Sequence, residues 1–480
     1  MSHKNHFESS VGFGWANWLW AFLILCALTI PVPLIVLYSA PQTHLALPLV
    51  CLAMIVAYSG IRLSLLALEG REKLLNLTFW TFGYVWMGIA PLAQLSIGYF
   101  PWPGTYSNWI LTYSSLIVLV GFIAYDVGSW LGGRLYYSRV KRGLIFPYSL
   151  SISKRRVYVL SFVAILLTAI SIYKVGGLQL LFSARTSFEE IVGANFALTG
   201  ALIWTSLLRA PAMVALALML VVWKKRKQFS VRGHWIVWHM ALLSLLLVLN
   251  LVVSNPMSTP RLLSGTLALT LMFLTLGWSR RHSFGAWVTG LISALLLVFP
   301  YTDIFRYEGS SLSLQPVVGQ LSSADYEIFQ QLANTIIFVS ASGVTFGYQL
   351  LGALFFWVPR GVWPNKPYGS GQLVGEYLGY QHTNLSSPLW AEAYINAGLI
   401  GVILTLLLWG FVSSLLQNLY IASYENATSL IAVLVPILAA YQIFLLRGDL
   451  QNGTAYLVPI VAYLFLAGKV TRAEYGGYRT

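Results

Sequence analysis

The chain has 480 residues, of which 58% are apolar and only 9% are charged, and its mean hydropathy is +0.72. Soluble domains carry about 25% charged residues, and disordered chains combine low hydrophobicity with high charge, so this composition excludes both classes. It predicts an all-α polytopic membrane protein. The two cysteines, Cys26 and Cys51, fall in apolar runs and indicate neither a disulfide framework nor a metal site.

Twelve apolar runs are long enough to cross a membrane, since a spanning helix needs about 20 residues. The first run is long, contains Pro31 and Pro33, and is followed by no small-residue cleavage site, which indicates an uncleaved anchor. We expect about 12 transmembrane helices in one integral membrane domain over 1–480. The predicted runs are 17–39, 44–66, 76–98, 109–132, 157–173, 199–223, 235–253, 262–278, 284–301, 397–419, 428–446 and 452–468.

The charges of the linkers set the orientation of these runs. The segments 134–156, 224–232 and 280–281 are rich in Lys and Arg and all fall on the same side of the membrane. The positive-inside rule places that side, and with it both termini, in the cytoplasm. The net charge of +14 is therefore mostly a topology signal, and we expect no nucleic-acid partner.

Two outer loops are longer than the other connections. The shorter spans 174–198 and the longer spans 302–396. Unstructured loops of more than about 15 residues are uncommon, and the segments 325–340 and 344–357 have helical length and apolar content. We therefore expect a structured outer cap on the membrane domain. The two halves of the chain show no repeat.

Arg209 lies inside an apolar run, about 20 Å from its inner end. An arginine near the bilayer centre costs about 2.5–3.5 kcal/mol, so such a residue usually faces a cavity or a partner. We interpret it as a candidate ligand-binding residue. The alternatives are that its side chain snorkels outward or that the helix breaks at Pro211.

Three more outer arginines are candidate binding residues, each with a structural alternative. Arg261 begins a helix after a short outer turn and could be an interfacial anchor. Arg447 lies in an Arg-Gly-Asp turn and could pair with Asp449. Arg185 precedes Glu189 by four residues, which suits a surface pair on a helix.

The long loop supplies further cations. Arg306 stands between two acidic residues near its start. The block Pro-Arg-Gly-Val-Trp-Pro-Asn-Lys-Pro over 359–367 is stiffened by three prolines. It presents Arg360 and Lys366 on either side of Trp363, which suits an anionic lipid head group beside a sugar ring. The alternative is an amphipathic wedge at the membrane interface.

Several outer cations with few carboxylates nearby suggest a polyanion site, and a lipid diphosphate fits this charge and depth. A base is then needed to take a proton from a sugar hydroxyl. Glu392, His382, Asp325 and Glu327 are the candidates, and Glu392 lies about five residues before the next membrane span. The only metal signal is the unspecific Asp-Tyr-Glu triplet over 325–327, and nucleotide motifs are absent from the sequence, so we expect no cofactor.

The order of these outer motifs resembles the O-antigen and exopolysaccharide repeat-unit polymerases, the Wzy-type family. The resemblance rests on Asp-Tyr-Glu at 325–327, the 359–367 block, Ser-Ser-Pro at 386–388 and Glu-Ala-Tyr-Ile-Asn-Ala-Gly at 392–398. The turns that contain Arg261 and Arg447 also resemble that family. The 359–367 block is its most diagnostic part.

The resemblance implies a GT-C-like membrane glycosyltransferase that works without a metal in the bacterial inner membrane. It would transfer a growing glycan from undecaprenyl diphosphate to the non-reducing end of an incoming lipid-linked repeat unit, at the periplasmic face. The outer arginines would hold the diphosphates. A polysaccharide chain-length regulator is a further partner by analogy, beside the membrane lipid itself.

Two other functions stay open. An O-antigen ligase has a similar layout, but the 359–367 block favours the polymerase. A lipid-linked oligosaccharide flippase, or another transporter, would show related halves and charges near the midplane. Here the two halves do not match, and the outer cap holds most of the candidate residues.

Overall fold

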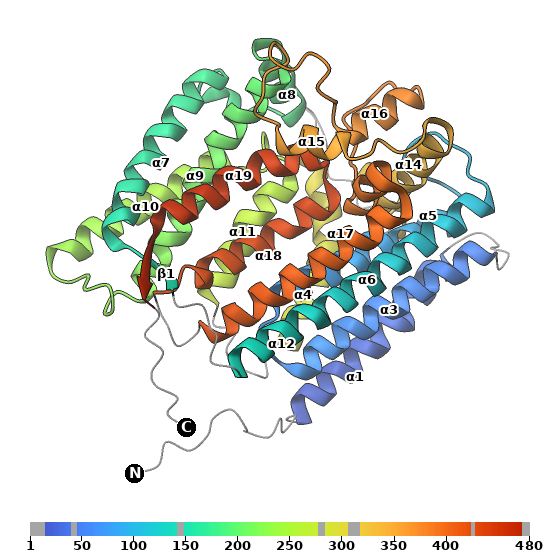
Figure 1. The fold of residues 1–480 in the computed structure, drawn as a ribbon, viewed down its shortest axis with the longest axis horizontal. Helices are drawn as coiled ribbons and strands as arrows, with labels where there is room; N and C mark the ends of the chain where they lie inside the picture. The colour runs from blue at the N-terminus through green and yellow to red at the C-terminus, as the bar shows by residue number, and fades with distance from the viewer. Residues whose placement is uncertain are drawn as a thin grey trace.

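The computed structural model describes residues 15–39, 46–141, 148–276, 284–305, 317–423 and 428–472. Within these ranges, nine helical segments are long and apolar enough to cross a membrane, and the chain is a predominantly helical multi-pass membrane protein. They run roughly alongside one another in Figure 1. The nine are α1 and α2 together (Trp15–Thr29, Pro31–Tyr38), α3 (Leu47–Glu69), α6 (Asn108–Lys141), α7 (Lys154–Val175), α9 (Leu198–Lys224), α10 (His234–Val253), the stretch of α12 and η3 (Phe284–Ser293, Ala294–Val298) running into η4 (Phe299–Phe305), α17 (Leu389–Ala422) and α19 (Leu450–Ala467).

Three further helical segments fall on the remaining predicted runs. Two are shorter apolar helices, α11 (Arg261–Thr275) and α18 (Ile431–Arg447). The third is broken by a π-helix, η1 (Gly83–Ile89), between α4 (Leu74–Phe82) and α5 (Ala90–Ile97). Each of the twelve predicted runs therefore overlaps helical backbone where the structure describes it.

The outer segments form short helices of their own, which gather at one end of the bundle (Figure 1). The helix predicted over 325–340 is found as α14, which begins at Ile328. The one predicted over 344–357 is found as the shorter α15, which begins at Tyr348 because Gly343, Phe346 and Gly347 take positive φ. These elements are η2 (Gln179–Phe182), α8 (Arg185–Asn195), α13 (Val317–Gln320), η5 (Ala324–Tyr326), α14 (Ile328–Ser342), α15 (Tyr348–Leu354) and α16 (Ser370–Tyr377). At the other end, β1 (Tyr148–Ile152) pairs antiparallel with β2 (Gly468–Arg472).

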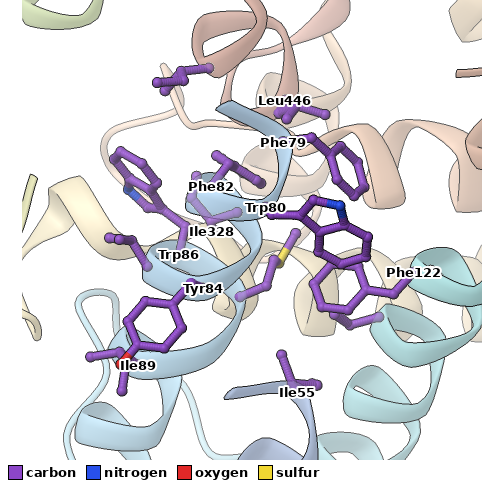
Figure 2. Close-up of a cluster of buried hydrophobic side chains, with 14 of the residues drawn as sticks. Ile55, Phe79, Trp80, Phe82, Tyr84, Trp86, Ile89, Phe122, Ile328 and Leu446 are labelled. Atoms are coloured by element: carbon purple, nitrogen blue, oxygen red, sulfur yellow. The ribbon is translucent and has the colours of Figure 1, made fainter. Parts of the chain in front are cut away.

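The core centres on the broken helix α4–η1–α5, in which every residue of α4 and η1 is buried. Its aromatic side chains radiate toward α3, α6, α14 and α18 (Figure 2). Pro91 lacks an N–H and so cannot continue the regular hydrogen-bond ladder. The π-helical turn before it accommodates this, since the Ala90 N–H donates to Val85, five residues earlier.

Helices α6 and α17 pack along a seam of glycines. A β-carbon at Gly128 would lie 1.9 Å from the Leu407 carbonyl oxygen, and one at Gly410 would lie 2.0 Å from that of Tyr125. Small residues let membrane helices approach at backbone distance. Helix α17 is itself broken where Gly398 has a φ of 60°, which separates the short outer part that carries Glu392 from the long inner part.

Candidate functional site

Asp325 lies where two arginines from distant parts of the chain converge. Arg261, the first residue of α11, forms a buried ion pair with the Asp325 carboxylate, and its second terminal nitrogen donates to the Thr302 hydroxyl at 3.3 Å. Arg447, the last residue of α18, donates to the backbone oxygens of Asp325 at 3.3 Å and Ala324 at 3.5 Å. We call Arg261, Asp325 and Arg447 the arginine centre.

The arginine centre is fixed by the aromatic core beneath it. The Trp86 indole on η1 donates to the Asp325 carbonyl at 3.0 Å, and the Phe299 ring lies under the Arg261 guanidinium at 5.2 Å from its centroid. A buried π-helical turn therefore sets the position of the segment to which both arginines bind. This placement agrees with the tendency of π-helical turns to lie at functional sites.

Arg209 and Arg185 lie beside this centre. Helix α9 continues through Pro211, so the predicted alternative of a helix break is wrong. The Arg209 guanidinium is buried, reaches the turn that leads to Arg261, and lies over the Phe188 ring of α8 at 5.2 Å. Its hydrogen-bond partners are neutral: the carbonyl oxygens of Val253 (3.0 Å) and Ser258 (3.4 Å) and the hydroxyls of Thr259 (3.2 Å) and Tyr456 (3.3 Å).

Arg185 takes the pairing that was its structural alternative, with Glu189 at 2.7 Å on α8. Its charge, like that of Arg261, nevertheless acts on Arg447, as do the carboxylates of Asp325 and Glu327. Three arginines from three separate connections thus share one electrostatic neighbourhood. A small cavity beside Arg209, bordered by Tyr441 and Tyr456, has room for about one water molecule.

Glu392 occupies a second, acidic centre together with Asp449, which follows Arg447 by two residues. The Glu392 carboxylate accepts hydrogen bonds from the Ser370 hydroxyl at 2.8 Å and from the Leu450 N–H at 3.1 Å. The Asp449 carboxylate accepts from the N–H groups of Gly371 at 3.2 Å and Gln451 at 2.8 Å. We call Glu392 and Asp449 the carboxylate pair.

The N-termini of α16 and α19 both point at the carboxylate pair, and their dipoles favour negative charge there. Burial nevertheless raises the pKa of Asp449, against the lowering effect of its backbone hydrogen bonds. The predicted alternative in which Arg447 pairs with Asp449 is wrong, because the arginine turns to 324–325 and the aspartate to 371 and 451. The three-residue turn 447–449 therefore joins the arginine centre to the carboxylate pair.

His382 is exposed, and its ring stacks on Trp102 at 5.8 Å between centroids. The Trp102 indole donates to the buried Glu327 carboxylate, which also accepts the Ser386 N–H at 3.1 Å. This places His382 near the segment that carries Asp325, two residues before Glu327. The third candidate base is thus linked to the arginine centre through an aromatic ring.

The hydrogen bonds of Arg360 and Lys366 stay within residues 356–367 and do not reach the arginine centre. Lys366 is buried and donates to the carbonyls of Phe356 and of Val358, the latter at 3.1 Å. Arg360 donates to the carbonyls of Lys366 at 2.5 Å and Pro367 at 3.4 Å. Burial, followed by the charge of Arg360, lowers the pKa of Lys366.

The remaining side chains of the block are aromatic. Trp363 meets the Tyr348 ring edge-on at 5.9 Å, and the Arg360 guanidinium lies 3.8 Å from the centroid of Tyr368. The cations of the block hold their own loop closed. Arg306, the other cation predicted in this loop, lies outside the described residues.

Sequence reasoning passed over three residues of these sites. Asp449 has a signal, because an aspartate directly before an apolar helix is a common N-cap, and its side chain does accept the Gln451 N–H. Trp102 stands between two prolines, which indicates a rigid presentation. Trp86 has no such signal, since it is one of many aromatic residues in an apolar run.

Comparisons of this chain with protein-family models, with curated proteins and with solved structures find no match. The functional argument therefore depends on the residues described above.

Proposed function

We propose that this protein is a membrane glycosyltransferase that polymerises undecaprenyl-diphosphate-linked repeat units into O-antigen or exopolysaccharide. The topology proposed with it has twelve spans, cytoplasmic termini and a periplasmic cap over a GT-C-like bundle in the bacterial inner membrane. The observation that carries the proposal is the convergence of Arg261, Arg447 and Arg185 on one neighbourhood. Asp325 and Glu189 each pair with one of these arginines, whereas Arg447 donates to backbone oxygens, so a ligand anion would add a charge partner for it.

A diphosphate matches this arrangement because arginine binds phosphate oxygens through two parallel N–H groups. During transfer, the hydroxyl oxygen of the incoming sugar bonds to the anomeric carbon of the glycan. The bond from that carbon to the diphosphate breaks, and the diphosphate leaves with the electron pair. Guanidinium groups of the arginine centre would stabilise the charge that develops on the leaving oxygen.

The hydroxyl proton goes to a base, for which Glu392, Asp325 and His382 remain the candidates. Asp325 is committed to Arg261, and His382 is the most accessible of the three. Glu392 is enclosed, but it lies one short turn from Arg447 through its contact with Leu450. Its nearness to both the diphosphate site and a buried second carboxylate supports it as the first residue to test. The reaction is proposed without a metal, as the resemblance implies.

The experiment is chain-length profiling of the surface glycan in a deletion strain. Single repeat units attached to the lipid A core or another carrier mean that polymerisation is lost while export and ligation survive, as the proposal requires. Absence of surface glycan with long polymer kept on the undecaprenyl carrier would identify a ligase. Precursor trapped at the inner leaflet would identify a flippase.

A second assay separates enzyme from transporter. The purified protein in detergent micelles is given a lipid-linked repeat unit, and chain elongation is followed on a gel. A polymerase lengthens its substrate in micelles, whereas a flippase needs two compartments and leaves it unchanged.

A further inference from the structure

The segment from Phe346 to Val362 exposes an apolar surface although it lies outside the candidate spans. Phe346 is 89% exposed, Trp357 is 55% exposed and Val362 is 78% exposed. Short helix α15 lies in the middle of this segment and turns its apolar side chains away from the protein. The other exposed apolar residues of the segment are Leu350, Leu351, Leu354 and Phe355. We call this surface the α15 face.

The backbone at the start of the α15 face is strained. Phe346 has a φ of 50°, a region that a bulky side chain avoids, and it is followed by Gly347 at 85°. Such conformations cost about 1–3 kcal/mol and persist where surrounding contacts impose them. Here the contacts are hydrogen bonds from Thr345 to the Ile395 carbonyl and from the Leu350 N–H to Asn396, at the break in α17. The α17 break therefore holds the Phe346 ring outward.

The contacts that hold the α15 face on α9 and α19 show how far it lies from the ends of those helices. The Ala353 carbonyl accepts the Thr454 hydroxyl at 2.7 Å, and Phe356 packs with Leu202 and Ala455. These partners lie four or five residues inside the outer ends of α9 and α19, which at 1.5 Å per residue is about 6–8 Å. Figure 1 shows α15 beside that end of α19.

The surrounding surface is continuous with the α15 face. Val458 is 50% exposed and lies one helical turn below Thr454, on the same side of α19. Arg360 lies within the same segment, two residues before Val362, and is half-buried and bound to its own loop. Apolar side chains at this depth match an interfacial helix, whose apolar face enters about 5–10 Å into the bilayer.

We propose that the α15 face is inserted in the outer leaflet of the membrane, among the acyl chains just below the lipid phosphates. The segment 346–362, which overlaps the start of the 359–367 block, is then a part of the membrane-bound surface and not of the aqueous cap. This inference rests on exposure and depth and not on the proposed glycan chemistry, and its assignment to the outer leaflet follows the topology proposed above.

The test places a nitroxide spin label at position 351 in the full-length protein, in a Cys26→Ala, Cys51→Ala background, reconstituted in vesicles of phosphatidylethanolamine and phosphatidylglycerol. Labels at position 458 and at position 376 on α16 are the lipid and water controls. We expect the 351 label to collide more with oxygen than with a water-soluble nickel chelate, as at 458, and the reverse at 376. Preferential collision with the chelate would overturn the proposal. Shielding from both reagents would identify a protein–protein contact and would also overturn it.

A second measurement needs no cysteine changes. The same vesicles are prepared with lipids brominated near the head group, and tryptophan quenching is compared between the wild type and Trp357→Phe. The difference isolates one indole among 18. We expect a smaller quenched fraction in the variant, and equal quenching would contradict insertion.

Discussion

Two groups of cations in the predicted outer loops differ in where their hydrogen-bond partners lie along the chain. Arg261 and Arg447 come from the start of one helix and the end of another and meet at a third segment, 324–325. Arg360 and Lys366 come from one short block and donate to carbonyls of the same block or of the residues just before it. Convergence from distant positions favours a binding site, whereas self-contained bonding favours a structural role. Because Arg360 and Lys366 lie close together in the sequence, the sequence alone favoured the 359–367 block as a ligand-binding site.

The largest effect is expected at the arginine centre. Arg261→Ala or Arg447→Ala should lower chain elongation by about 100-fold or more, the loss typical when one donor to a developing anion is removed. Arg447→Lys should restore little, because lysine lacks the planar fork. The measurement is elongation of a lipid-linked acceptor at matched protein levels, with Arg134→Ala, an exposed cation on α6, as the control.

Destabilisation must be separated from lost binding, because breaking a buried ion pair costs about 3–5 kcal/mol. The double variant Arg261→Asp, Asp325→Arg keeps the ion pair but places its cation at position 325. We expect the thermal midpoint to recover relative to Arg261→Asp alone, without recovery of elongation. Restored elongation would assign the pair a purely structural role.

The next effect is expected at the carboxylate pair. Glu392→Gln should lower elongation sharply, because an amide keeps the hydrogen-bonding shape but cannot take the proton. Asp449→Asn should lower it less, since that residue acts on Glu392 from beside it. Elongation rates across pH are the measurement. A wild-type rate in Glu392→Gln would move the base to His382 or Asp325.

A smaller effect is expected in the 359–367 block. Arg360→Ala and Lys366→Ala should each lower the thermal midpoint, and the double variant should lose less than the sum, with a coupling of about 0.5–3 kcal/mol, because both side chains close one loop. Lost elongation at an unchanged midpoint in Arg360→Ala would instead support the ligand contact predicted from sequence.

The smallest effect concerns pH. The pKa of Lys366 is lower in the folded protein than its ordinary 10.5, so the folded loop releases this proton first. Stability should then rise with pH from the lowered pKa up to 10.5, because in that window the unfolded chain binds more protons. Lys366→Met should remove this part of the slope. The measurement is the thermal midpoint of the wild type and of Lys366→Met as a function of pH. An identical pH slope in the two proteins would contradict the prediction.

The sequence predicted the membrane helices well, because a run of about 20 apolar residues leaves the backbone few alternatives in lipid. It could not predict the π-helical turn at 83–89, which depends on both Pro91 and the surrounding aromatic packing. The helix expected over 344–357 is shorter than predicted for a local reason, since the positive φ at Phe346 and Gly347 delays its start to Tyr348.

The candidate site was predicted in its residue types and less well in its pairings. Arg261, Arg447 and Asp325 were all named from the sequence, but the contacts of the two arginines with Asp325 span 64 and 122 positions. The pairing of Glu392 with Asp449 likewise depends on how the ends of α16, α17 and α19 meet. Without homologous sequences to compare, such distances cannot be deduced from a single chain.

The fully buried helix α4–η1–α5 has a consequence for biosynthesis. The Trp86 indole and the Gln94 amide find their acceptors at Asp325, Leu321 and Tyr326, more than 220 positions later. Domains emerge from the ribosome N-terminal end first, so these donors enter the membrane long before their acceptors exist. Assembly of the N-terminal half is therefore completed only by the last third of the chain, and a chain truncated before residue 321 lacks the acceptors of the Trp86 indole and the Gln94 amide.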